Sequence, residues 1–171
     1  ILYLCINKRL LQIDHTGNQL AAYILLSKFI SLTMIVYSGL SSVASIVIPS
    51  EKIFEKDVLA RKKILFYSHI VCLIQAIFFF NLKYFIKYLS DDLNVINICK
   101  KLIFPATIYQ YVNGYQYVME GILQGYQKFK LSSKINILIN TPLLLLLWKI
   151  NNPELIWYIG SLLFGIKILL I

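Results

Sequence analysis

One stretch of the chain, Leu102–Tyr126, carries the side chains with the most specific potential chemistry. On an α-helix, which turns by about 100° per residue, its polar residues fall within an arc of about 120°. The members of this polar stripe are Gln110, Asn113, Gln116, Tyr117, Glu120, Gln124 and Gln127. Amides and a carboxylate on one helix face need water, a ligand or polar partners. The stripe as a whole therefore predicts a cavity wall, although any single amide is better explained by an interhelical hydrogen bond.

Glu120 is the acidic residue that lies well inside an apolar run. An ionised carboxylate at the centre of a bilayer costs about 3 kcal/mol on insertion scales. Such a group can stay neutral until water or a cation reaches it, which is the chemistry of a proton-coupled carrier. A second interpretation places Glu120 near the end of its span, where it anchors the helix or serves helix packing. The sequence is compatible with both interpretations.

Three glycines lie in a narrow strip beside the polar stripe, at Gly114, Gly121 and Gly125. Gly121 and Gly125 have the small-xxx-small spacing that allows two membrane helices to approach closely. We therefore expect this strip to pack against another helix, while the remaining apolar face meets lipid or other neighbours.

Other polar residues lie in the neighbouring runs. Five serines share an arc of about 60° on a helix, namely Ser27, Ser31, Ser38, Ser42 and Ser45. Their spacing favours tight helix packing, with pore lining as the alternative. Lys28 either reaches the membrane surface or offsets the charge of Glu120. Asn136 and Asn140 precede Pro142, and the favoured role of their amides is to bond carbonyls that a proline kink leaves free.

The apolar runs that hold these residues are long enough to span a membrane, which takes about 20 residues. The five predicted spans are Leu20–Pro49, Ile64–Leu89, Leu102–Tyr126, Ile135–Ile150 and Glu154–Ile171. Ile1–Ile6 resembles the tail of a sixth. Pro49 and Ser50 are expected to end the first span, and Ser50 to cap a separate amphipathic stretch, Glu51–Lys63. The predicted fold class is all-α, a single polytopic transmembrane bundle that forms part of a longer protein.

The composition agrees with a membrane protein. The 171 residues are 58% hydrophobic, and the mean hydropathy is +0.70. Soluble proteins are about 45–50% apolar, and a chain of this length cannot bury the excess. The net charge is +9, but Lys and Arg lie mostly between the apolar runs. There they mark loops and helix ends, so the expected partner is the lipid bilayer and not nucleic acid.

No metal centre, cofactor or catalytic group is predicted. The three cysteines, Cys5, Cys72 and Cys99, are far apart, and His15 and His69 are isolated. This spacing supports neither a zinc site nor a disulfide framework. We also find no cluster of catalytic groups of the kind that a membrane-embedded enzyme needs, so an enzyme is not expected.

Two segments carry a resemblance to a known family. Glu120–Phe129 reads EGILQGYQKF and is followed by Asn136 and by Asn140-Thr141-Pro142. It resembles a segment of the MATE (multidrug and toxic compound extrusion) family, in the branch related to the DNA-damage-inducible F protein. Gly17–Ile24, GNQLAAYI, is similar to the start of the family's eighth helix, and Gly39–Ala44 also fits that helix.

The resemblance implies that the chain forms most of the C-terminal lobe of a transporter, from the end of helix 7 through helix 12. Family members have two six-helix lobes that face a central cavity, so the N-terminal lobe lies outside this chain. Two positions depart from the family pattern. Asn113 stands where many members carry an acid, and Gln124 replaces a common Arg.

The expected function is a cation-coupled antiporter, driven by protons or sodium, that exports small organic or xenobiotic compounds. Its cavity would be lined by Glu120, Asn113, Gln116, Gln110, Gln124 and Tyr117. One alternative is a lipid-linked oligosaccharide flippase of the same superfamily, although a pyrophosphate substrate requires a strongly basic cavity. Another is a structural membrane fragment without activity of its own. The sequence does not determine which membrane holds the protein.

Overall fold

The computed structural model describes residues 2–147, 149–150 and 152–171, and in these ranges it contains helices and no strands. The helices are α1 (Leu2–Ile13), α2 (Asn18–Lys52), α3 (Asp57–Phe85), the short 3₁₀-helix η1 (Ile86–Tyr88), α4 (Leu93–Gly125), α5 (Phe129–Leu147) and α6 (Pro153–Leu170). The prediction of an all-α fold is confirmed for this part of the chain.

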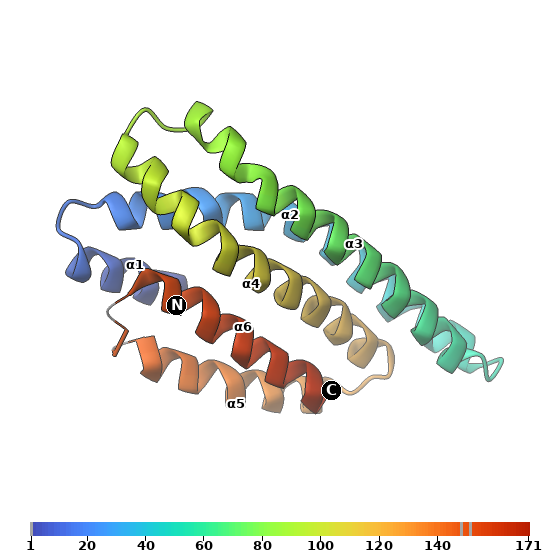
Figure 1. Ribbon diagram of the computed structural model, residues 1–171. Coiled ribbons are helices and arrows are strands. Elements are labelled where there is room, and N and C mark those ends of the chain that lie inside the picture. Colours follow the sequence, from blue (N-terminus) through green and yellow to red (C-terminus); the bar gives the residue numbers. More distant parts are fainter. Residues whose placement is uncertain (1, 148, 151) are drawn as a thin grey trace.

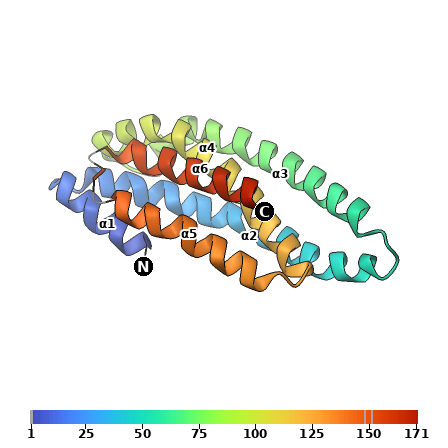
Figure 2. The same cartoon turned by 90° about the horizontal axis from the view of Figure 1, so that it is seen from below.

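Helix α4 lies at the centre of the bundle. It packs against α2, α3 and α6, while α5 packs against α6 (Figure 1). α4 and α6 run in the same direction, and α1 lies beside α2 and α5 when the bundle is seen from below (Figure 2). The helix with the polar stripe is therefore the helix with the most neighbours.

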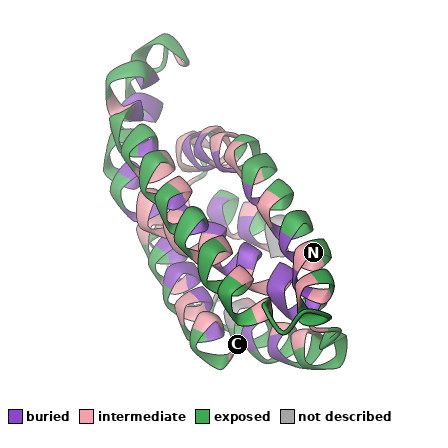
Figure 3. Ribbon diagram, turned by 90° about the vertical axis from the view of Figure 1, so that its right-hand side faces the viewer, coloured by how far each residue is buried: buried purple, intermediate pink, exposed green. Residues whose placement is uncertain are grey.

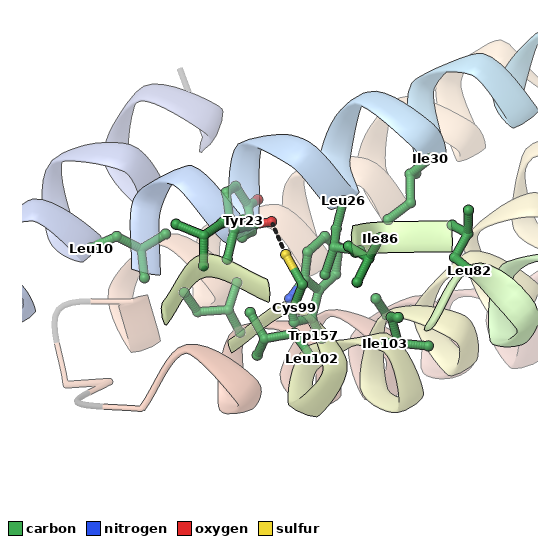
Figure 4. Packing of buried hydrophobic residues seen from close by; sticks show 14 of the residues in the cluster. Leu10, Tyr23, Leu26, Ile30, Leu82, Ile86, Cys99, Leu102, Ile103 and Trp157 are labelled. Atoms are coloured by element: carbon green, nitrogen blue, oxygen red, sulfur yellow. Dashed lines mark hydrogen bonds between the residues drawn. The ribbon is translucent and has the colours of Figure 1, made fainter. Parts of the chain in front are cut away.

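The largest apolar core lies where α1, α2, the end of α3, η1, α4 and α6 meet (Figure 4). Leu26, Leu102 and Trp157 come from three different helices and are almost fully buried. In a bilayer, where the alternative to burial is contact with lipid, side chains of this size hold the helices together mainly through van der Waals packing. The Cys99 thiol donates a weak hydrogen bond to the Ala22 carbonyl oxygen, at 3.8 Å. This core fixes one end of α4 against α2 and α6.

The outer faces of the helices are apolar as well. Exposed residues run along the outside of the bundle (Figure 3), and Leu32, Phe66 and Leu162 are each more than 60% exposed. Three helical segments are long and apolar enough to cross a membrane, namely Asn18–Lys52, Asp57–Tyr88 and Pro153–Leu170. The outer faces therefore suit contact with lipid. The spans predicted at α4 and α5 remain predictions, and for α4 the polar stripe lowers the hydropathy.

The end of the first span differs from the prediction. α2 continues through Pro49 and ends at Lys52, and the Ser50 hydroxyl donates to the Val47 carbonyl at 2.8 Å. Ser50 therefore does not cap a separate helix, and the expected amphipathic stretch is divided between the ends of α2 and α3. A proline removes only one amide donor, so a long helix can extend one turn past it.

The N-cap position of α2 is Gly17, which has a φ of 77° and no side chain that could cap the helix. A carboxylate from the preceding turn takes the place of that cap. Asp14 Oδ1 accepts hydrogen bonds from the Thr16 hydroxyl at 2.5 Å and the Thr16 amide at 2.9 Å. Asp14 Oδ2 accepts a bond from the Gln19 amide at 3.0 Å. Gln19 lies in the first turn of α2, so Asp14 satisfies an amide that the helix itself cannot.

This turn gives a prediction about acid. The bond from the Thr16 hydroxyl, followed by that from the Gln19 amide, holds the pKa of Asp14 below its ordinary value of 3.8. A lowered pKa means that the stabilisation is complete above pH 3.8 and is lost as pH falls through the folded-state pKa. Carboxyl ¹³C titration should therefore give a midpoint below 3.8 for Asp14, returning toward that value in Thr16→Val. A wild-type midpoint at or above 3.8 would rule out the cap.

Candidate functional site

The glycine strip of α4 lies against α2. A Cβ atom at Gly114 would collide with the Tyr37 ring, and one at Gly121 would collide with the Ser41 backbone. At Gly125 it would lie 2.9 Å from Ile48 Cβ. α4 can approach α2 this closely because these three positions carry no side chain. Part of the polar stripe beside the strip is thereby turned toward the interior of the bundle, while Gln124 and Gln127 are exposed.

A close contact also brings α6 to α4. A Cβ atom at Gly160 would lie 2.8 Å from the Tyr109 ring. Toward the C-terminal ends of the two helices, the Lys167 ammonium donates a hydrogen bond to Glu120 Oε1 and forms an ion pair with it. The side chain of Lys167 is 5% exposed and that of Glu120 is 18% exposed. The pair is thus largely removed from the surroundings of the bundle.

An open pocket of about 510 Å³ surrounds this ion pair. Its walls come from α2, α4, α5 and α6. The lining residues are Met34, Asn113, Gln116, Tyr117, Glu120, Asn136, Asn140, Phe164 and Lys167. The pocket combines four amides, two aromatic rings and two opposite charges, and its volume lies in the range of about 300–1,000 Å³ that small-molecule sites occupy.

Four of the predicted cavity residues lie together in this pocket, namely Asn113, Gln116, Tyr117 and Glu120. The side chain of Gln116 is buried and that of Tyr117 is 38% exposed. The amide of Asn113 donates to the Met34 sulfur at 3.4 Å. The acid of the stripe is therefore turned toward neighbouring helices, not outward.

The two other predicted cavity residues lie elsewhere. Gln110 is fully buried between helices, and its amide donates to the Thr33 hydroxyl at 2.5 Å and to Gln75 Oε1 at 3.4 Å. Gln110 thus has the interhelical role that was favoured for any single amide. Gln124 is exposed and is not among the described residues that line the pocket.

The outlying polar residues also differ from expectation. The preference for helix packing is wrong for Ser31, Ser38 and Ser42, which are exposed, because the glycine strip selects a different face of α2. Lys28 is exposed as well, and it is Lys167 that offsets Glu120. Asn136 and Asn140, for which a role at the proline kink was favoured, line the pocket. Ser27 and Ser31 line a second pocket of about 240 Å³.

Lys167 is the functional candidate that sequence reasoning missed. It lies in the last turn of α6, and its partner Glu120 is 47 positions away in the chain. One signal was available, because Lys167 is a lone cation within the apolar run that follows Glu154. A buried lysine in a membrane helix usually pairs with an acid, although the sequence does not show which acid.

The pocket has groups that can hold a positively charged organic molecule. Glu120 supplies a negative charge, and the faces of Tyr117 and Phe164 can attract a cation. The Lys167 ammonium already lies 5.9 Å from the centre of the Phe164 ring. The amides of Asn113, Gln116, Asn136 and Asn140 can orient polar groups of a ligand through hydrogen bonds.

Comparison with models of protein families gives a match. The MatE family model matches residues 16–147, which cover α2 through α5 and include Glu120. No curated protein and no solved structure matches the chain significantly. The match covers most of the chain and agrees with the helical fold and its apolar outer faces. The chain therefore belongs to the MatE family of membrane transporters.

Proposed function

We propose that this chain is the C-terminal lobe of a cation-coupled antiporter that exports small organic cations. The observation that carries the proposal is the carboxylate of Glu120, which lines a pocket and is sheltered by four helices. A carboxylate in this position can hold one cation at a time. The coupling ion, a proton or sodium, and the substrate then compete for the same group.

Competition of this kind is sufficient for exchange. Two ligands that exclude each other are negatively coupled, so a high concentration of the coupling ion on one side releases substrate there. The rest of the cycle requires a second lobe. Rocking of two lobes about the pocket would expose it to each side of the membrane in turn. The N-terminal lobe is the expected partner.

The charge of the pocket argues against the flippase alternative. A pyrophosphate-linked substrate needs several unpaired cations. Lys167 is the positive charge among the described lining residues, and Glu120 neutralises it. The paired charges and the four amides suit a substrate with one positive centre better than a polyanion.

The test is Glu120→Gln in the complete transporter, reconstituted in vesicles with a proton or sodium gradient. Because glutamine fills similar space without charge, the pocket should remain while gradient-driven export of tetraphenylphosphonium falls to the level of empty vesicles. Gln124→Met is the matched control, since it changes a stripe residue on the same helix that is exposed, and it should export normally. Export by Glu120→Gln at the wild-type rate, still dependent on the gradient, would refute the proposal.

A further inference from the structure

The contacts of Lys167 are the contacts that an organic cation would make in the same pocket. Its ammonium is paired with Glu120 and lies 5.9 Å from the centre of the Phe164 ring. A carboxylate and an aromatic face are the two groups that most commonly recognise an organic cation. The lysine therefore occupies the position at which a positively charged ligand would be held.

We infer that Lys167 is a tethered competitor, which occupies Glu120 whenever no transported cation does. The inference rests on the proposed function. It adds a role for a residue outside the family match, since residue 167 lies beyond the matched region. A substrate cation or a proton that takes Glu120 must first displace the ammonium. The empty transporter thereby keeps its buried carboxylate paired while it changes conformation.

Inside a membrane protein, a buried charge costs much more free energy when it is unpaired than when it is paired. An unpaired carboxylate in this pocket has to be hydrated or protonated before the lobe can move through the bilayer. Lys167 removes that need. Because its ammonium is already attached to the protein, no free cation has to be bound, and no translational freedom is lost when it pairs with Glu120. When it is displaced, the oxygens of Asn136 and Asn140 are available in the same pocket to accept its hydrogen bonds.

The groups that face Glu120 make the competition simple. On α4 the nearby titratable group is Tyr117, and on α6 it is Lys167. The described lining residues contributed by α2 and α5 are Met34, Asn136 and Asn140, and none of them is charged. A change in the occupancy of Glu120 is therefore opposed by one built-in cation, and removing it should have a direct effect on ligand affinity.

The experiment measures binding of tetraphenylphosphonium to the complete transporter in nanodiscs by isothermal titration calorimetry. If Glu120 is free of Lys167 in about one molecule in ten, apparent affinity is reduced about tenfold. Lys167→Gln should therefore bind the probe about tenfold more tightly than the wild type. Lys28→Gln removes an exposed lysine outside the pocket lining and should leave affinity unchanged.

Two further variants keep the test decisive. Lys167→Arg retains a cation, so it should bind the probe no more tightly than the wild type, even if Lys167→Gln does not fold. Glu120→Gln/Lys167→Gln has a neutral pair and should bind more weakly than Lys167→Gln alone. A tenfold gain in Lys167→Arg would overturn the inference, because the charge would then have no part in the competition.

The results also separate the inference from the function on which it rests. If Glu120→Gln loses binding while folded Lys167→Gln keeps wild-type affinity, the tethered competitor is wrong and the carrier proposal survives. If Glu120→Gln binds as well as the wild type, the carboxylate is not the cation site and both fail.

Discussion

Lys167→Met should lower the free energy of unfolding by about 3–5 kcal/mol, the typical cost of leaving one partner of a buried ion pair alone. The two side chains are 5% and 18% exposed, so the remaining carboxylate would be hydrated only from the side of the pocket. The double variant Glu120→Gln/Lys167→Met should recover most of the loss, because it leaves no unpaired charge. This non-additivity is the signature of a direct interaction.

Unfolding of the purified protein in mixed micelles, as sodium dodecyl sulfate is increased, provides the measurement. Lys28→Met is the control, since that lysine is exposed on α2 and should change stability by less than about 0.5 kcal/mol. If Lys167→Met and Lys28→Met have equal effects, or if the double variant is as unstable as the sum of its single variants, the ion pair contributes nothing to the fold.

Gly121→Ala should lower the free energy of unfolding. Overpacking usually costs about 1–3 kcal/mol, and we expect a value toward the upper end of this range. The added methyl group would meet the backbone of Ser41, which cannot rotate away as a flexible side chain can. α2 and α4 would have to separate, and the polar stripe would turn away from the pocket. Transport should therefore fall along with stability.

Gly39→Ala is the matched control on the partner helix. Its new methyl group meets no heavy atom of the described residues within 4 Å, and alanine favours a helix over glycine by up to about 1 kcal/mol. The same unfolding titration should show Gly39→Ala at or above wild-type stability. A Gly121→Ala protein as stable as Gly39→Ala would show that close packing of α2 on α4 does not hold the bundle together.

The parts of the fold that follow from local periodicity could be predicted from sequence. The length of the apolar runs gave the helices, and the spacing of amides and glycines divided α4 into a polar face and a small-residue strip. Boundaries were less accurate, because Pro49 and Ser50 looked like an end although α2 extends to Lys52. The position of a proline in the sequence shows which backbone hydrogen bond is missing. Whether the helix continues past it depends on tertiary packing.

The candidate site depended on contacts between helices, which sequence periodicity does not contain. Gln110 and Gln116 lie at the two edges of the polar stripe, about 120° apart around α4, and one bonds Thr33 and Gln75 while the other lines the pocket. The difference arises from the helices that lie opposite each position along α4. For the same reason, the pairing of Glu120 with Lys167 could not be derived until α6 was placed beside α4.

The central claim is that the carboxylate of Glu120 is the group for which substrate and coupling ion compete. The most direct test is the affinity of the complete transporter for tetraphenylphosphonium, measured across a range of pH and sodium concentration in the wild type and in Glu120→Gln. We predict that acid or sodium weakens binding in the wild type, whereas the residual affinity of Glu120→Gln no longer responds to either. An equal response to proton or sodium in the two proteins would place the exchange at another site.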